Sequence, residues 1–187
     1  MDNYKYKYLK YKHKYNQVKL QQSGGFSIPA DLKPSFDSGK GDPLTQRRLA
    51  LVELIDFKGV NEQNWDILRQ IYDKDAIITM ANTPFVIKGI EENIKMMKEM
   101  SKFSSDSKII KHEIQFGSGD WTALTFLNEG TFNGPYFDPL TQKTFQPNGK
   151  KYKLYGCSLM QWNGEKIIKE LVFWDDASFK TQLGIKD

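Results

Sequence analysis

The sequence has 187 residues, 39% of them hydrophobic and 13% aromatic, which fits one folded domain with a sizeable core and argues against two domains. Its single cysteine, Cys157, excludes an internal disulfide framework and a cysteine-based zinc site, a composition typical of a reducing compartment. No apolar run approaches the roughly 20 residues of a membrane-spanning helix, and the charged residues 1–5 are unlike a signal peptide. We therefore expect an intracellular protein.

The net charge of +4 is unevenly distributed along the chain. Six of the 27 Lys and Arg residues, but only one of the 23 acidic residues, fall within residues 1–22. Tyrosines recur there at helical spacing, which predicts an amphipathic helix with an aromatic seam; a solvated extension is the alternative, because so short a helix without a packing partner is marginal. These tyrosines are Tyr4, Tyr8, Tyr11 and Tyr15. We expect this basic tail, residues 1–20, to bind an assembly partner or an anionic surface such as a nucleic-acid backbone.

Residues 21–43 are rich in Ser, Gly, Pro and Asp and poor in aliphatic side chains, which is typical of a linker. The domain boundary is therefore expected near Asp42, with a folded body over residues 44–187. Protease digestion should remove the tail and leave a body that begins between about residues 30 and 46.

The first half of the body has helical periodicity. Thr45 is expected to cap a first helix that ends near Gly59, and Asn61 or Asn64 to cap a second. A short apolar strand is predicted over residues 75–80 and a third helix over residues 90–103. The apolar stripes are Leu51, Leu54 and Ile55 in the first helix, Trp65, Leu68 and Tyr72 in the second, and Ile90, Ile94, Met97, Met100 and Phe103 in the third.

From residue 108 the hydrophobic period changes to two. Strands are predicted over residues 108–116, 120–132, 151–162 and 166–175. The glycine-containing turns between them favour hairpins and thus an antiparallel sheet. Helices first and strands afterwards indicate an α+β fold with the helices packed on one face of the sheet.

The last predicted strand ends in two carboxylates beside aromatic side chains. Burial near Phe173 and Trp174 would disfavour ionisation and raise the pKa of Asp175 toward neutrality, so that this carboxyl could act as a general acid or base. Asp176 is expected to cap the short helix that follows. Strand alternation places Asp175 on one face and Glu170 with Trp174 on the other, and a bulge would exchange these faces.

His112 shares strand parity with three apolar residues, so it is expected to point into an apolar interior. There its neutral imidazole could shuttle a proton, although a lone histidine on an apolar face is more often a core residue with satisfied hydrogen bonds. The three apolar residues are Ile110, Ile114 and Phe116. Further pocket candidates are Trp65, Trp121, Glu129, Tyr136, Tyr155, Glu170 and Trp174. The acids and tyrosines among them could instead face outward or a dimer contact.

Other chemistries find no support in the sequence. No Gly-rich phosphate loop follows a strand, no nucleophile elbow is present, and two histidines without an HExxH motif argue against a metal site. We therefore expect no cofactor and no metal.

Several short segments together resemble the SnoaL-like polyketide cyclase and ester cyclase family of the nuclear transport factor 2-like superfamily. They are Gly-Asp-Trp-Thr-Ala at 119–123, Glu-Gly-Thr-Phe-Asn-Gly-Pro at 129–135, Gly-Glu-Lys-Ile-Ile at 164–168 and Gln-Leu-Gly at 182–184. The resemblance implies a strongly curved sheet wrapped around three helices into a cone with a ligand pocket at its open end, and a homodimer formed through the sheet. It also implies a cyclase or isomerase that needs no cofactor and acts on a small hydrophobic carbonyl compound, with Asp175 as general acid/base and His112 or a tyrosine stabilising the enolate.

The Tyr-Lys tail resembles the amino-terminal segment of many proteins of giant DNA viruses. That resemblance implies an address or packaging tag, and a location in the host cytoplasm or the virion. The alternative to an enzyme is therefore a non-catalytic dimeric scaffold or ligand-binding protein of a viral particle, tethered by its basic tail. The sequence names no substrate, because the polar residues 137–146 shape the expected pocket mouth and their conformation is not readable.

Overall fold

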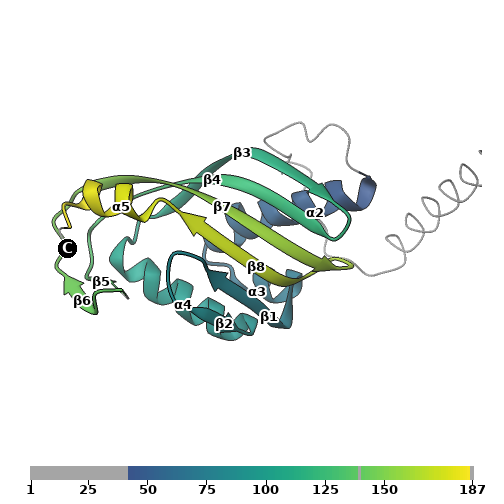
Figure 1. Cartoon of the computed structure of the whole chain (residues 1–187), viewed down its shortest axis with the longest axis horizontal. Coiled ribbons are helices and arrows are strands. Elements are labelled where there is room, and N and C mark those ends of the chain that lie inside the picture. The colour runs from purple at the N-terminus through teal and green to yellow at the C-terminus, as the bar shows by residue number, and fades with distance from the viewer. Residues whose placement is uncertain (1–41, 139, 186–187) are drawn as a thin grey trace, which may run out of the picture.

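The computed structural model describes residues 42–138 and 140–185 (Figure 1). The predicted tail and nearly all of the predicted linker lie outside the described residues. The helices are α2 (Pro43–Leu54), the π-helical turn η1 (Ile55–Val60), α3 (Trp65–Ile71), α4 (Ile90–Phe103) and α5 (Asp176–Leu183). The strands are β1 (Tyr72–Met80), β2 (Val86–Lys88), β3 (Lys108–Ser118), β4 (Trp121–Thr131), β5 (Tyr136–Asp138), β6 (Lys143–Phe145), β7 (Lys151–Asn163) and β8 (Lys166–Trp174).

The α+β prediction is confirmed. A curved six-stranded sheet has the order β2-β1-β8-β7-β4-β3, and its neighbours are antiparallel except for β1 and β8. Helices α2, α3 and α4 pack against one face of this sheet, which we call the inner face, and α5 lies at one end beside the β5–β6 hairpin (Figure 1). Strand β1 is longer than predicted, because Tyr72 begins the strand instead of completing a helix.

Helix α2 begins earlier than the sequence suggested. Asp42, not Thr45, is the N-cap: its Oδ1 accepts hydrogen bonds from the backbone N–H groups of Leu44 at 2.9 Å and Thr45 at 3.1 Å. Pro43 fits the first helical position, where a backbone N–H would have no partner within the helix, because proline has no N–H. The helix then widens into η1, which places Asp56 one turn beyond the buried Glu53.

Two bulged strands decide which side chains face inward. In β3 the register with β4 shifts between Ile109 and Lys111 and again between His112 and Gln115. In β8 the register with β7 shifts between Ile167 and Lys169. Each extra residue reverses the alternation of the strand beyond it. The predicted companions of His112, namely Ile110, Ile114 and Phe116, are therefore exposed while His112 itself is buried.

A buried arginine fastens α2 to the ends of two hairpins. Arg48 donates from Nη1 to the Gly119 carbonyl at 2.7 Å and from Nε to the Gly164 carbonyl at 2.9 Å. Its guanidinium also lies 5.8 Å from the centre of the Trp162 ring and 3.5 Å from Asp120 Oδ1. Both turns, β3–β4 and β7–β8, are thus tied to the helix that leads to Glu53 and Asp56.

The apolar core has two parts. The larger part joins the helices to the inner face of the sheet, and the smaller one is an aromatic cluster between α5, the end of α4 and the β5–β6 hairpin. In the smaller cluster Phe179 meets Phe103, Tyr136 and Tyr152 edge to face, with centroids 5.1 to 5.8 Å apart. This cluster closes one end of the molecule.

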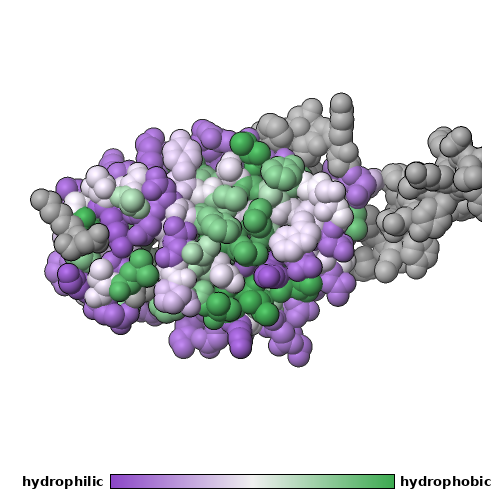
Figure 2. All heavy atoms as spheres, viewed as in Figure 1, coloured by the Kyte–Doolittle hydropathy of each residue, from purple (hydrophilic) through white to green (hydrophobic). Residues whose placement is uncertain are grey.

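Apolar side chains also gather on the opposite, outer face of the sheet. Figure 2 shows them as a green band across the middle of the molecule, over β4, β7 and β8. Exposed members of this face are Ile114, Phe116, Trp121, Tyr155 and Phe173. None of the helices within the described residues has the length and apolar character needed to cross a membrane.

Candidate functional site

The inner face of the sheet carries a buried carboxylate at its centre. Glu170 on β8 is only 6% exposed and lies opposite Ile78 of β1 and Met160 of β7, both of which are buried. The hydroxyl of Tyr72 donates to Glu170 Oε2 at 2.6 Å, and the Ser158 hydroxyl donates to Oε1. Both oxygens of one acid are thus held by neutral hydroxyl groups.

Burial raises the pKa of the Glu170 carboxyl above its ordinary value, because the charged form loses its hydration. The hydrogen bonds from Ser158 and Tyr72 act in the opposite direction, and the nearby negative charge of Asp56 adds to the increase. Burial, followed by the charge of Glu170, raises the pKa of Tyr72 well above its usual value, so this phenol keeps its proton. Glu170 therefore lies in an environment that favours its protonated form more than water does, as is common for acids that take part in proton transfer.

A second buried network lies beside the first. His112 Nε2 is 2.8 Å from Asp56 Oδ2, and His112 Nδ1 is 3.0 Å from Gln115 Nε2. The same amide nitrogen donates to Glu53 Oε1 at 2.5 Å. Because the amide N–H faces Nδ1, the arrangement suits a neutral imidazole that carries its proton on Nε2 and donates it to Asp56. His112 thus fixes Asp56, whose side chain is 13% exposed and whose charge raises the pKa of both Glu170 and Tyr72.

Half-buried apolar side chains from four elements pack against the core that contains the Glu170 pair. They are Trp65 of α3, Met96 and Met97 of α4, Phe126 of β4, and Val172 and Trp174 of β8. Gly156 permits this packing, since a Cβ there would lie 2.1 Å from Cζ of the Phe126 ring. A carboxylic acid with apolar and aromatic neighbours suits a ligand that is itself largely apolar.

Neither aspartate at the end of β8 has its expected role. Asp175 is exposed, and its Oδ1 accepts a hydrogen bond from Ser178 N at 3.0 Å, so Asp175 caps α5. Asp176 instead pairs with Lys180 at 3.1 Å and lies 3.4 Å from Trp174 Nε1. The predicted enclosure of Asp175 is wrong because the bulge in β8 turns Glu170 and Trp174 inward and leaves Asp175 outside.

The other predicted pocket residues do not converge on Glu170. Trp121 and Tyr155 are exposed, and Glu129 is paired with Lys153 at 2.8 Å. Tyr136 belongs to the smaller aromatic cluster, where burial raises its pKa to about 12. Of the predicted set, Glu170, Trp65 and Trp174 belong to the inner face or pack on its core.

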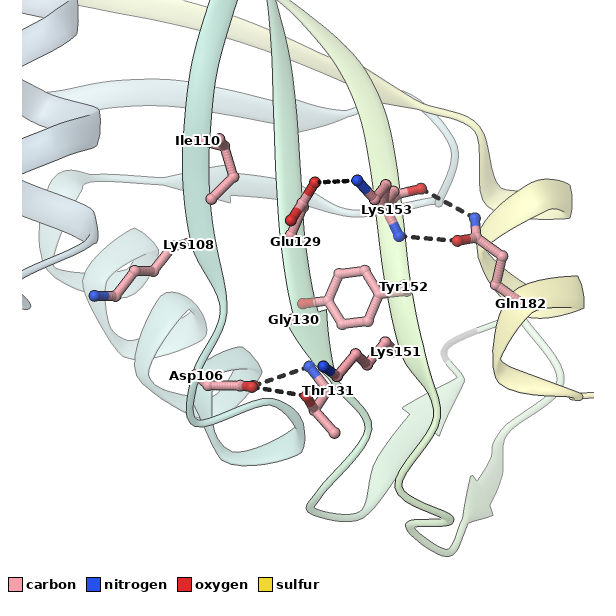
Figure 3. Close-up of a pocket in the computed structure, with 10 residues that line it drawn as sticks. All are labelled: Asp106, Lys108, Ile110, Glu129, Gly130, Thr131, Lys151, Tyr152, Lys153 and Gln182. Carbon is pink, nitrogen blue, oxygen red and sulfur yellow. Dashed lines mark hydrogen bonds and ion pairs between the residues drawn. The ribbon is translucent and has the colours of Figure 1, made fainter.

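An open hollow of about 480 Å³ lies away from this centre, at the end of β3, β4 and β7 next to Gln182 of α5 (Figure 3). Both of its acids are engaged: Glu129 pairs with Lys153, and Asp106 accepts hydrogen bonds from the backbone and hydroxyl of Thr131 at 2.9 and 2.7 Å. The hydrogen bonds to Thr131 outweigh desolvation and lower the pKa of Asp106. The hollow is thus lined by mixed charges, and the lysines Lys108 and Lys151 also face it.

Tyr72, Ser158 and Asp56 were missed in the sequence. Tyr72 was placed on a helix, Asp56 was one acid among many, and Ser158 carries no motif. Period-two alternation along β7 would have placed Ser158 on the same face as Met160 and Trp162. That face is apolar, so a serine on it is unusual.

In the described part of the chain, no cluster of three or more His, Cys, Asp or Glu residues is arranged to hold a metal ion.

The comparisons with known proteins agree with this architecture. The sequence profile of the SnoaL-like polyketide cyclases matches residues 48–183. No curated protein matches the sequence.

Solved structures share the fold at low sequence identity. A candidate SnoaL-like polyketide cyclase from Jannaschia sp. CCS1 superposes with a TM-score of 0.69 at 15% identity, over 79% of this chain and 99% of its own. IdmH, a candidate polyketide cyclase from Streptomyces antibioticus, superposes with a TM-score of 0.62 at 16% identity, over 74% of this chain and 99% of its own. A Catenulispora acidiphila protein with a ketosteroid isomerase-like fold, solved with trimethylamine, superposes with a TM-score of 0.59 at 12% identity, over 73% of this chain and 93% of its own. Since the family profile covers most of the folded body, the chain belongs to the SnoaL-like polyketide cyclase family.

Proposed function

We propose that the protein is a cofactor-independent cyclase or isomerase that acts on a small hydrophobic carbonyl compound, with Glu170 as the general acid/base. The observation that carries this proposal is the buried Glu170 carboxyl, held by the hydroxyls of Tyr72 and Ser158 on the inner face. Membership of a family named for polyketide cyclases supports the reaction class.

The chemistry balances without an external electron donor or acceptor. The Glu170 carboxylate takes a proton from the carbon next to a carbonyl, and the C–H electron pair forms the C=C bond of an enolate while the charge moves to oxygen. In a cyclization the enolate carbon attacks a second carbonyl of the same molecule, a C–C bond forms, and the resulting alkoxide recovers the proton from Glu170. In an isomerization the proton returns to a different carbon.

The remaining polar residues have positioning roles in this scheme. Tyr72 and Ser158 orient the two carboxyl oxygens of Glu170, and the Asp56 charge helps to raise the Glu170 pKa. His112 acts through Asp56, to which it is bonded, so we assign it to orientation of that charge and not to contact with the enolate. Asp175 loses its assignment as acid/base because it is exposed and engaged as a helix cap.

The test is exchange of the α-protons of 1-tetralone in D2O, followed by NMR. The wild-type protein should accelerate exchange, and Glu170→Gln should lower the rate by a factor on the order of 10²–10⁴ because the amide cannot accept the proton. Asp175→Asn is the matched control and should retain the wild-type rate. A folded Glu170→Gln variant that exchanges as fast as the wild type would refute the assignment of Glu170.

A second copy of the chain is the partner that the outer face suits best, and we propose a homodimer through it. The exposed Trp121, Tyr155 and Phe173 on that face favour this arrangement, because contiguous apolar surface on a sheet is typically covered. Light scattering should give a dimer for the wild type and a monomer for Tyr155→Lys. Phe85→Lys, at an exposed aromatic before β2, should stay dimeric; a monomeric wild type would contradict the proposal.

The alternative function, a non-catalytic dimeric scaffold or ligand-binding protein in a viral particle, uses the same dimer together with the basic tail. Six lysines within residues 1–22 favour an anionic surface or an assembly partner in the host cytoplasm or virion. Binding to single-stranded DNA should weaken with salt and vanish when residues 1–22 are deleted. Binding that survives the deletion would contradict the role of the tail.

A further inference from the structure

We propose that Asn93 binds the neutral carbonyl or hydroxyl oxygen of a small ligand inside the fold. Asn93 is fully buried, and neither its Nδ2 nor its Oδ1 has a hydrogen-bond partner among the residues that the structure describes. A buried amide without partners is costly, because it has given up its hydrogen bonds to water. Such a group in a native core calls for a bound polar partner.

The position of Asn93 connects it with the Glu170 centre. Gly89 N–H donates to the Ala76 carbonyl at 2.8 Å and so ties the start of α4 to β1, and Asn93 follows one helical turn later. Its neighbours on that helix, Ile90 and Ile94, are buried in the larger core together with Ala76 and Ile78 of β1. Ile78 lies opposite Glu170 in the β1–β8 register. Helix α4, which carries Asn93, and strand β8, which carries Glu170, thus both contact β1.

Asn93 differs from the other buried amide with an unpaired atom. Gln115 also has a buried oxygen without a partner in the described chain, but its nitrogen is fixed by His112 and Glu53. Asn93 has both a donor and an acceptor to offer. The half-buried Met96, Met97 and Trp65 pack on the larger core from α4 and α3, and the methionines are flexible apolar side chains.

The chemistry of the amide limits the ligand class. Its N–H can donate to a ketone or aldehyde oxygen, and a hydroxyl can use both the N–H and the C=O. A carboxylate or phosphate is disfavoured, because an uncompensated anion among apolar side chains loses its hydration. Arg69 of the adjacent helix α3 is a cation, but it is already bonded to Glu91 and Asp66.

The inference rests on the proposed function only for the choice of an apolar carbonyl compound as probe. Binding of 1-tetralone is compared with binding of tetralin, which has the same ring system without the oxygen, by calorimetry or competition. The wild type should prefer the ketone by about 3- to 10-fold, the amount that one neutral hydrogen bond contributes. Asn93→Leu should fold, melt no lower than the wild type, and lose that preference because the oxygen finds no donor.

Glu170→Gln separates this inference from the catalytic proposal. The ketone preference should survive in Glu170→Gln and disappear in Asn93→Leu, whatever happens to α-proton exchange. A preference that is unchanged in Asn93→Leu, or a wild-type protein that binds both compounds equally or neither of them, would overturn the role of Asn93. So would a large drop in melting temperature for Asn93→Leu, since it would show that the amide has a structural partner.

Discussion

Arg48 offers the sharpest test of how the fold holds the candidate site together. Its side chain is 2% exposed and donates to the carbonyl groups of Gly119 and Gly164, one in each of two hairpin turns. In Arg48→Met the aliphatic stem is kept but both carbonyls lose a charged donor. A hydrogen bond to a charged group contributes about 1.5–3 kcal/mol, so losing these two should cost about 3–5 kcal/mol. For a domain of this size that loss corresponds to a decrease in Tm of roughly 6–20 °C.

The neighbouring Arg47 supplies the control. Its side chain is 23% exposed and its ion pair with Glu165 is 3.4 Å long, so Arg47→Met should cost less than about 1 kcal/mol. Thermal and urea unfolding followed by circular dichroism would measure both variants. Equal losses for the two variants would refute the reasoning, because burial and the carbonyl contacts would then not distinguish them. A further consequence is expected at the site: a loosened α2 should displace Asp56, so Arg48→Met should also slow α-proton exchange.

Two other predictions concern packing and pH. Gly156→Ala should destabilise the fold by about 1–3 kcal/mol in urea unfolding, because the new methyl group overlaps the Phe126 ring; an unchanged midpoint would contradict this close contact. Burial alone would raise the pKa of Asp138, but its bonds to Lys180 and the adjacent loop lower it. A lowered folded-state pKa contributes stability above the unfolded pKa that is lost as pH falls through the folded pKa. The decrease of Tm below about pH 4 should therefore be smaller in Asp138→Asn; an unchanged decrease would count against the ion pair.

Periodicity was sufficient to predict the α+β class and the approximate extents of the later strands. The stripe in α4, where Ile90, Ile94 and Phe103 are buried, and the alternation along the second half of β7 reflect side-chain burial, which local periodicity indicates. Met100 of the predicted stripe is exposed, and β4 buries three successive residues, 122–124, instead of alternating. Tyr72 was assigned to a helix because its spacing from Trp65 and Leu68 continued the helical stripe. The chain instead changes to a strand there, and Tyr72 pairs with Ile167 of β8. This pairing joins residues that are far apart in the sequence, so local periodicity does not reveal it.

The site was harder to predict because bulges in the strands determine which side chains face inward. Regular alternation from Ile167 would carry Asp175 to the inner face, and the bulge before Lys169 gives that face to Glu170. His112 was correctly placed in the interior, but its neighbours are Asp56, Glu53 and Gln115 and not the expected isoleucines and phenylalanine. Bulges depend on pairing between distant strands, so their positions cannot be deduced from one strand alone.

The most direct test of the central claim is the pKa of Glu170 itself, measured by NMR titration of glutamate side-chain carboxyl carbons in the wild type and in Glu170→Gln. We predict one carboxyl that titrates above the ordinary glutamate value and is missing from the variant, as its burial requires. If every glutamate of the wild type titrates at or below that ordinary value, the buried acid does not hold its proton as proposed and the acid/base mechanism is wrong.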